Sequence, residues 1–304
     1  MDAKLTLKES GEPVAIISGG KYNKKIISIT DNKDAEEPQI NDVIDILTEN
    51  YLGVKKNKRK INIEDIYKMQ KLLSKKKTDN PIVREAEEKL KEHNSKVLTL
   101  EDGSIKKIPN YKKRECIYVA GMSGSGKSTW CANYMKMFNG LFPEKNIYIF
   151  SRKNEDEAFN EISNINRVII DENIILNPLQ MEMFADSLCL FDDCDILPKK
   201  LLEAIIDIQS QLLQGARYLG TYVIVTSHNL SNYNKTRVVL SECEFYVIFP
   251  RACAVQPLKK FLHTYGGFDA KEIEMIRNIP SRWVCIHATC PSYVISESSV
   301  KIFR

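Results

Sequence analysis

The stretch "ECIYVAGMSGSGKSTWCANYMKMF", residues 115–138, decides the fold of this 304-residue chain. It begins with a short apolar run, continues with a loop of glycine and serine, and ends with a helix-like segment. The apolar run predicts a buried strand, and the final segment predicts a helix that opens at Lys127. A strand, a glycine-rich loop and a helix in this order indicate an α/β fold.

The loop at residues 121–128, "GMSGSGKS", matches the pattern G-x-x-x-x-G-K-[ST] of the P-loop. Its glycines let backbone N–H groups point at a phosphate, and the helix adds its positive end. We therefore predict that ATP binds here with Mg²⁺. Lys127 would reach the β- and γ-phosphates, Ser128 would ligate the metal, and Thr129 would assist at the α-phosphate. The predicted nucleotide-binding residues are Gly121, Met122, Ser123, Gly124, Ser125, Gly126, Lys127, Ser128 and Thr129.

The metal requires an acidic partner, and the stretch "SLCLFDDCD" supplies it. An apolar run ends at Asp192 and Asp193, at the edge of an open α/β sheet where ligands bind. If this stretch is a Walker-B motif, Asp192 holds Mg²⁺ through water, and Asp193 polarises the water that attacks the phosphate. An ordinary acidic turn after a strand is the alternative.

A second predicted strand, "TYVIVTSHNL", also ends in polar residues. Its His228 is a candidate catalytic residue that senses the γ-phosphate or orients water, and a solvent-facing strand end is the alternative. Arg217 and Arg237 are candidates for neutralising charge in the transition state, one of them from a neighbouring subunit. A surface salt bridge is the alternative for each arginine.

After Glu115 the chain alternates apolar runs with helical segments. Most of the runs are continuously apolar, as in strands covered on both faces of a mostly parallel sheet. Strands are expected at 116–120, 146–151, 167–170, 187–191, 221–227, 244–249 and 283–287, and crossover helices at 127–138 and 198–217. The predicted fold class is α/β, a P-loop NTPase with a mostly parallel sheet flanked by helices, over residues 111–304.

Residues 1–110 are predicted to form a small α+β accessory region. It would contain a hairpin of strands at 13–18 and 24–30, and helices at 40–51, at 63–73 and after Pro81. Between Tyr51 and Lys113 the chain carries 18 Lys and Arg against 9 Asp and Glu, while its overall net charge is +4. Clustered cations favour a nucleic-acid partner, and a solvated helical face is the alternative.

Two further features concern the environment of the chain. No apolar run approaches the roughly 20 residues that cross a bilayer, and the first thirty residues lack a signal-peptide pattern, so we expect no membrane association and no export. The cysteines Cys116, Cys131, Cys189 and Cys285 lie in apolar runs, as reduced core thiols do, which indicates a reducing compartment.

From residue 111 to 304 the sequence resembles the genome-packaging ATPases of large nucleocytoplasmic DNA viruses, which are P-loop motors of the FtsK/HerA class. The resemblance rests on "GMSGSGKST", "LCLFDD", "GARYLGTYVIVTSHNL" and "SRWVCIHATCPSYVI". Two positions depart from the family pattern. His228 stands where Gln is usual, and Ala216 separates Gly215 from Arg217, whereas Gly and Arg are adjacent in the family.

The resemblance implies an ATP-hydrolysing, ring-forming homo-oligomer that translocates double-stranded DNA into a capsid, with capsid proteins as partners. It places the protein in the host cytoplasm, at a viral factory, or in the virion. An ABC-type ATPase is an alternative because His228 follows Asp193 by 35 residues, yet the segment before "LCLFDD" lacks the signature LSGGQ. A nucleotide-gated scaffold with little turnover is the other alternative.

Overall fold

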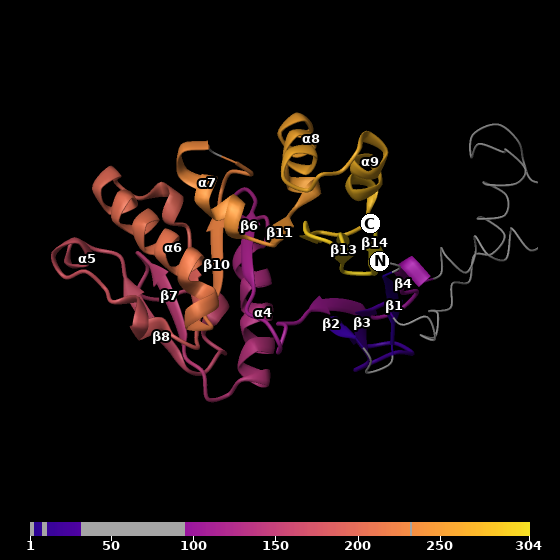
Figure 1. The fold of residues 1–304 in the computed structure, drawn as a ribbon, viewed down its shortest axis with the longest axis horizontal. Coiled ribbons are helices and arrows are strands. Elements are labelled where there is room, and N and C mark those ends of the chain that lie inside the picture. Colours follow the sequence, from indigo (N-terminus) through magenta and orange to yellow (C-terminus); the bar gives the residue numbers. More distant parts are fainter. Residues whose placement is uncertain (1–2, 8–10, 32–94, 232) are drawn as a thin grey trace, which may run out of the picture.

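The computed structural model describes residues 3–7, 11–31, 95–231 and 233–304. Within them, ten strands form a central sheet in the order β4-β14-β13-β12-β11-β6-β10-β9-β7-β8 (Figure 1). The strands from β11 to β8 run parallel, and those beyond β11 are antiparallel. The parallel strands are β6 (Cys116–Ala120), β7 (Ile147–Ser151), β8 (Ile165–Ile169), β9 (Leu188–Phe191), β10 (Tyr222–Ser227) and β11 (Phe245–Ile248). The antiparallel strands are β12 (Val284–His287), β13 (Tyr293–Ser296), β14 (Ser299–Ile302) and β4 (Val97–Thr99).

Helices cover both faces of this sheet. They are α4 (Lys127–Leu141), α5 (Asn173–Leu176), α6 (Lys199–Leu219), α7 (Tyr233–Glu242), α8 (Val255–Thr264) and α9 (Ala270–Asn278). On β6, Ile117 and Val119 pack in the cluster that contains α4, whereas Cys116 and Tyr118 pack in the cluster that contains α6, α8 and α9. Both faces of the strand are therefore buried, which explains its continuous apolar sequence.

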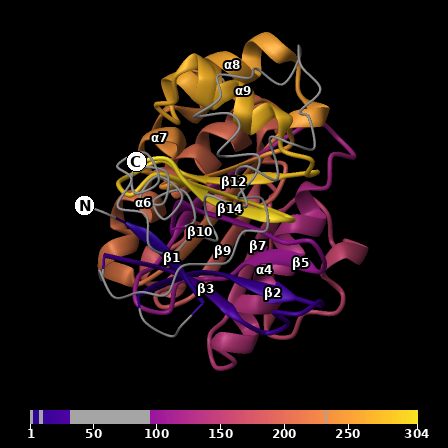
Figure 2. The same cartoon turned by 90° about the vertical axis from the view of Figure 1, so that its right-hand side faces the viewer.

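A four-stranded antiparallel sheet lies beside the large one, in the order β1-β3-β2-β5. Its strands are β1 (Lys4–Thr6), β2 (Glu12–Ser18), β3 (Ile26–Thr30) and β5 (Ser104–Lys107). Figure 2 shows this small sheet below β12 and β14, and the Ile105 N–H donates to the Glu297 carbonyl at 2.7 Å. The two sheets are thus joined by backbone as well as by packing.

A buried ion pair also joins the small sheet to the large one. The ammonium of Lys107, on β5, lies 2.6 Å from a carboxylate oxygen of Glu115, the residue before β6, and their side chains are only 1% and 3% exposed. The Tyr134 hydroxyl, on α4, donates to the other oxygen of Glu115 at 2.5 Å. One carboxylate therefore connects β5, β6 and α4.

The structure confirms the predicted α/β P-loop NTPase fold. Each of the seven expected strands and both expected crossover helices form, and β2 and β3 make the expected hairpin. The helices predicted at 40–51, at 63–73 and after Pro81 fall outside the described residues, as does most of the basic segment. The boundary at residue 110 remains a prediction, although β4, before it, already belongs to the large sheet.

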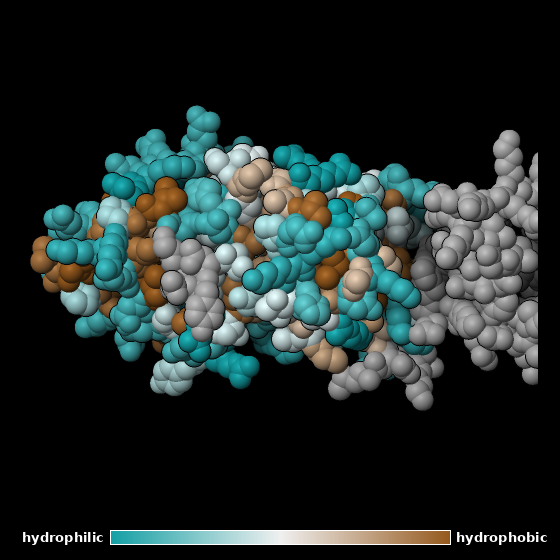
Figure 3. Space-filling model, turned by 90° about the horizontal axis from the view of Figure 1, so that it is seen from above, coloured by the Kyte–Doolittle hydropathy of each residue, from teal (hydrophilic) through white to brown (hydrophobic). Residues whose placement is uncertain are grey.

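The cysteines, the apolar character of the helices and the exposed apolar side chains can be compared with the sequence-based expectations. All eight cysteines are free thiols, and the four in apolar runs are buried. No helix of the described residues has the length and apolar character to span a membrane. Ile175 and Leu176, on α5, are exposed. Figure 3 shows an apolar patch at its left end, the end at which Figure 1 places α5.

Candidate active site

The P-loop joins β6 to α4 at the carboxyl edge of the parallel strands. Gly124 and Gly126 have φ angles of 75° and 109°, which favour glycine, and Gly126 caps α4. A Cβ on Gly121 would lie 2.6 Å from the Ser125 hydroxyl and 2.8 Å from the Phe249 ring. The loop conformation thus favours glycine at each of these three positions.

Lys127 lies across this loop. Its ammonium donates to the carbonyl of Gly121 at 3.0 Å and lies 3.7 Å from a carboxylate oxygen of Asp193. The side chain is 7% exposed. A buried cation held between the loop and an acidic group stands where phosphate oxygens would be neutralised.

Asp192 and Asp193 follow β9 at the same edge of the sheet. Burial, and then the neighbouring charge of Asp193, raise the pKa of Asp192 to about 6. Asp193 has a φ of 50°, and its backbone N–H donates to the hydroxyl of Thr226 at 2.8 Å. Thr226, on β10, lies 3.3 Å from Asp192 and 3.4 Å from Asp193 and so connects the two acidic groups to the next strand.

His228 lies between two carboxylates. Its Nε2 is 3.7 Å from Asp193, and its Nδ1 is 3.1 Å from Asp195. Partial burial of Asp195 opposes ionisation, but hydrogen bonds from the His228 N–H, the His228 ring and the Ser227 hydroxyl lower the pKa of its carboxyl. The sequence reasoning missed Asp195, although the third aspartate of "FDDCD" is the signal that marks it.

The residues present fit a bound Mg²⁺ ion. Asp192 is a buried carboxylate whose ionised form a cation would favour, and Ser128 stands in the first turn of α4. Carboxylate and hydroxyl oxygens are hard donors, and Mg²⁺ beside a nucleotide commonly takes one or two of them together with phosphates and water. The buried Ser125 hydroxyl has no hydrogen-bond partner within the described chain, which leaves it available to a ligand oxygen.

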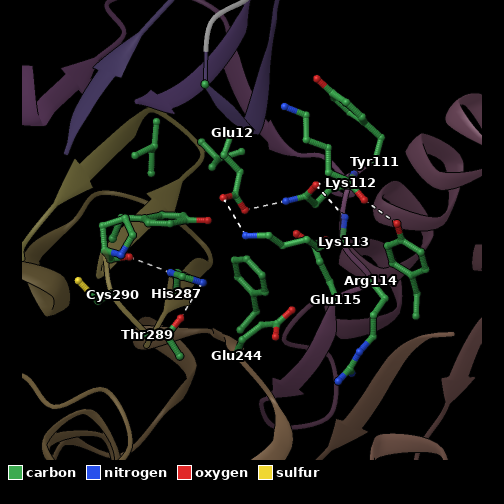
Figure 4. A pocket seen from close by; sticks show the side chains of 18 of the residues that line it. Glu12, Tyr111, Lys112, Lys113, Arg114, Glu115, Glu244, His287, Thr289 and Cys290 are labelled. Carbon is green, nitrogen blue, oxygen red and sulfur yellow. Dashed lines mark hydrogen bonds and ion pairs between the residues drawn. The ribbon is translucent and has the colours of Figure 1, made fainter. Parts of the chain in front are cut away.

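One of the two candidate arginines, Arg217, lies away from this cluster. Arg217, in the last turn of α6, lines a cavity of about 1090 Å³ with Glu115 and Glu244, which precede β6 and β11, so it lies at the amino edge of the sheet. Figure 4 shows this cavity with Glu12, Lys113 and His287. Arg237 is exposed on α7, which follows the carboxyl end of β10.

The sequence is similar to one curated protein and to several solved structures. "Uncharacterized protein V3" of Sputnik virophage is 35% identical over 207 residues, which make up 67% of this chain and 83% of V3. No protein-family model matches the sequence.

The similar solved structures share little sequence with this chain. B204, the DNA-packaging ATPase of Sulfolobus turreted icosahedral virus, is 14% identical, with a TM-score of 0.43 over 63% of this chain and 98% of B204. The cytoplasmic domain of the type VII secretion ATPase EccC from Thermomonospora curvata is 14% identical, with a TM-score of 0.43 over 67% of this chain and 28% of EccC.

Proposed function

We propose that this chain, which belongs to the family of the Sputnik virophage protein V3, is an ATP-hydrolysing motor that translocates double-stranded viral DNA into capsids. The observation that carries the proposal is the meeting of one cation and two acidic groups at the P-loop. Lys127 lies 3.7 Å from Asp193, and Thr226 bonds to both Asp193 and Asp192.

Different residues at this site bind the phosphates, hold the metal ion and orient the attacking water. The backbone of the P-loop and the ammonium of Lys127 bind the phosphates, and Asp192 with Ser128 would hold Mg²⁺. The ion supplies positive charge to the phosphates when it is bound. Asp193 accepts a hydrogen bond from the attacking water and orients it. The ring of His228 lies nearby and presents a further polar group to the γ-phosphate.

The wider role is supported by three observations besides the site. The sequence resembles viral genome-packaging ATPases, its relative V3 comes from a virophage, and the segment 51–113 has twice as many basic as acidic residues. On this proposal the protein forms a homo-oligomeric ring, contacts double-stranded DNA and capsid proteins, and works in the host cytoplasm or the virion. Arg237, or another arginine, would then act on a neighbouring subunit's nucleotide.

The experiment that tests the proposal measures ATP hydrolysis by the full chain with and without double-stranded DNA. A motor should hydrolyse ATP with Mg²⁺ and turn over several-fold faster on DNA, and Lys127→Ala should abolish both rates. ATP binding with no hydrolysis, on or off DNA, would favour the nucleotide-gated scaffold instead. Electron microscopy of the same sample shows whether rings form.

A further inference from the structure

The loop Ser281–Trp283 reaches the P-loop from the side opposite to Asp192. Because β12 is antiparallel to β11, with Val284 paired to Ile248, this loop lies at the carboxyl edge of the parallel strands. A guanidinium nitrogen of Arg282 lies 3.7 Å from the position that a Cβ on Gly126 would take. An arginine therefore stands beside the residue that caps α4.

The backbone of Arg282 is held in place by a hydrogen bond to a neighbouring carboxylate. Its N–H donates to a carboxylate oxygen of Glu297 at 2.8 Å, and the Ser281 hydroxyl donates to the same oxygen at 3.1 Å. Arg282 is exposed, and its guanidinium forms no hydrogen bond or ion pair with the part of the chain that the structure describes. A free planar cation on a fixed backbone is suited to bidentate binding of phosphate oxygens.

A small cavity lies next to this loop, between α4, β5 and the start of β12. Its volume is about 120 Å³, and Trp130, Asn133, Trp283 and Glu297 are among the residues that line it. The two indole rings meet edge to face, with centroids 6.2 Å apart. Trp130 is buried, whereas Trp283 is half-buried and Asn133 is exposed, so part of Trp283 and of Asn133 is open to solvent.

We propose that this loop and cavity hold the nucleoside end of the nucleotide, with Arg282 on the phosphates and the base against Trp283. The inference rests on the function proposed above. The strand order supports it, because Asp192 and Asp193 follow β9 on one side of β6, while Arg282 lies on the other side, beyond β11. A nucleotide whose γ-phosphate faces the aspartates therefore extends its base toward Trp283.

The chemistry of the cavity matches a base. An aromatic ring stacks on a base whichever base it is, because every base has an aromatic face. The amide of Asn133 both donates and accepts, so it can pair with a base edge. Since the chain contains only two tryptophans and both line this cavity, intrinsic fluorescence reports on its occupancy.

The test compares Mg²⁺–ADP with Mg²⁺–pyrophosphate, which lacks the nucleoside, on the full chain. Calorimetry measures whether each binds, and tryptophan emission shows whether the cavity is filled. We expect both to bind, but only ADP to change the tryptophan emission of the wild type and of Trp130→Phe, in which Trp283 is the single tryptophan. Arg282→Gln should weaken both ligands about ten-fold, as expected for the removal of a charge-assisted bond. Arg282→Lys should recover part of that affinity.

A matched control is Arg167→Gln, on β8 at the far edge of the sheet, which should bind both ligands as the wild type does. If ADP binds without changing tryptophan emission and Arg282→Gln keeps full affinity, the base and phosphates lie elsewhere and the inference is overturned. The proposed function survives that outcome. If neither ADP nor pyrophosphate binds the wild type, the proposed function and this inference both fail.

Discussion

Asp195 binds His228 through both of its carboxylate oxygens. One oxygen lies 3.1 Å from Nδ1 of the imidazole, and the other accepts the backbone N–H of the same residue at 2.9 Å. An ionised carboxylate only accepts hydrogen bonds, so Nδ1 carries the proton and the opposite ring nitrogen, Nε2, faces Asp193. Asp195 therefore fixes both the backbone and the ring orientation of His228.

The first prediction concerns this pair. Asp195→Ala removes the acceptor that orients His228, so kcat for ATP hydrolysis should fall about ten-fold or more, while KM changes less than about two-fold. Steady-state kinetics on purified protein measure the two constants. Asp207→Asn, on the exposed face of α6, is the control and should leave both unchanged. A rise in KM with an unaltered kcat would show that Asp195 acts on nucleotide binding instead.

Lys127 gives the second prediction. Lys127→Ala removes the ammonium that donates to the P-loop carbonyl of Gly121, and ATP affinity or turnover should drop about 100-fold or more. Lys136→Ala on the same helix removes a solvent-facing ammonium paired with Glu161 and should retain activity. Equilibrium binding of a non-hydrolysable ATP analogue and a phosphate-release assay measure the effect. Wild-type hydrolysis in Lys127→Ala would exclude the site.

The third prediction separates binding from hydrolysis. Asp193→Asn keeps the shape of the side chain and leaves Asp192 for the metal, so Mg²⁺–ATP should still bind while hydrolysis is abolished. Binding is followed by calorimetry and turnover by phosphate release, on the same preparation. Should affinity and turnover fall together, Asp193 would have to share the metal-binding role of Asp192.

Glu244 provides a prediction about pH. Burial, and then the charge of Glu115, raise the pKa of Glu244 from 4.5 to about 7. The folded state holds this proton more tightly than the unfolded state does, so the contribution of Glu244 to the free energy of unfolding declines as pH rises from about 4.5 to about 7. Glu244→Gln should remove that decline and raise the free energy of unfolding at pH 8 by about 1–2 kcal/mol, after allowance for solvent screening.

Urea denaturation at pH 5 and pH 8 measures this effect. Glu182→Gln changes an exposed carboxylate and serves as the control, with the same pH dependence as the wild type. A Glu244→Gln protein that is less stable than the wild type at pH 8 would mean that the fold needs the ionised carboxylate, with Arg114 as the nearby charge that favours it.

The basic segment gives the last prediction. If "VKKNKRK" and "LLSKKKTDN" contact DNA phosphates, neutralising about four of their lysines should make the salt dependence of DNA binding shallower. The slope of log affinity against log salt should change by roughly 0.9 for each phosphate that the variant no longer neutralises. ATP hydrolysis without DNA should be unaffected. Titrations of double-stranded DNA affinity against salt compare the two proteins, and identical slopes would show that these lysines only solvate the surface.

The sequence was sufficient for the core of the fold because its signals there are local. Buried parallel strands have continuously apolar sequences, and the P-loop motif fixes the order strand, loop, helix. By contrast β14, "SVKI", and β4, "VLT", are short, and their pairing joins segments about 200 residues apart. No local pattern specifies such a pairing.

The same distinction between local sequence signals and long-range pairing holds at the candidate active site. Lys127, Asp192 and Asp193 were found from motif spacing, and the structure brings Lys127 to Asp193. Arg217 is a candidate from sequence, but it precedes β10, and the parallel direction of that strand places it at the edge away from the P-loop. Arg282 lies in the stretch "SRWVCIHATCPSYVI", but no local signal marks it as a site residue, and the antiparallel return of β12 brings it to Gly126.

The ion pair between Lys107 and Glu115 has a consequence for how the molecule comes apart. Removing one partner of a buried pair leaves an uncompensated charge, which costs about 3–5 kcal/mol. Moving β5 away from β6 would separate Lys107 from Glu115, and the same carboxylate accepts the Tyr134 hydroxyl on the helix that carries Lys127. The small sheet and the nucleotide-binding helix should therefore melt in a single cooperative transition, with no intermediate in which the P-loop stays folded alone.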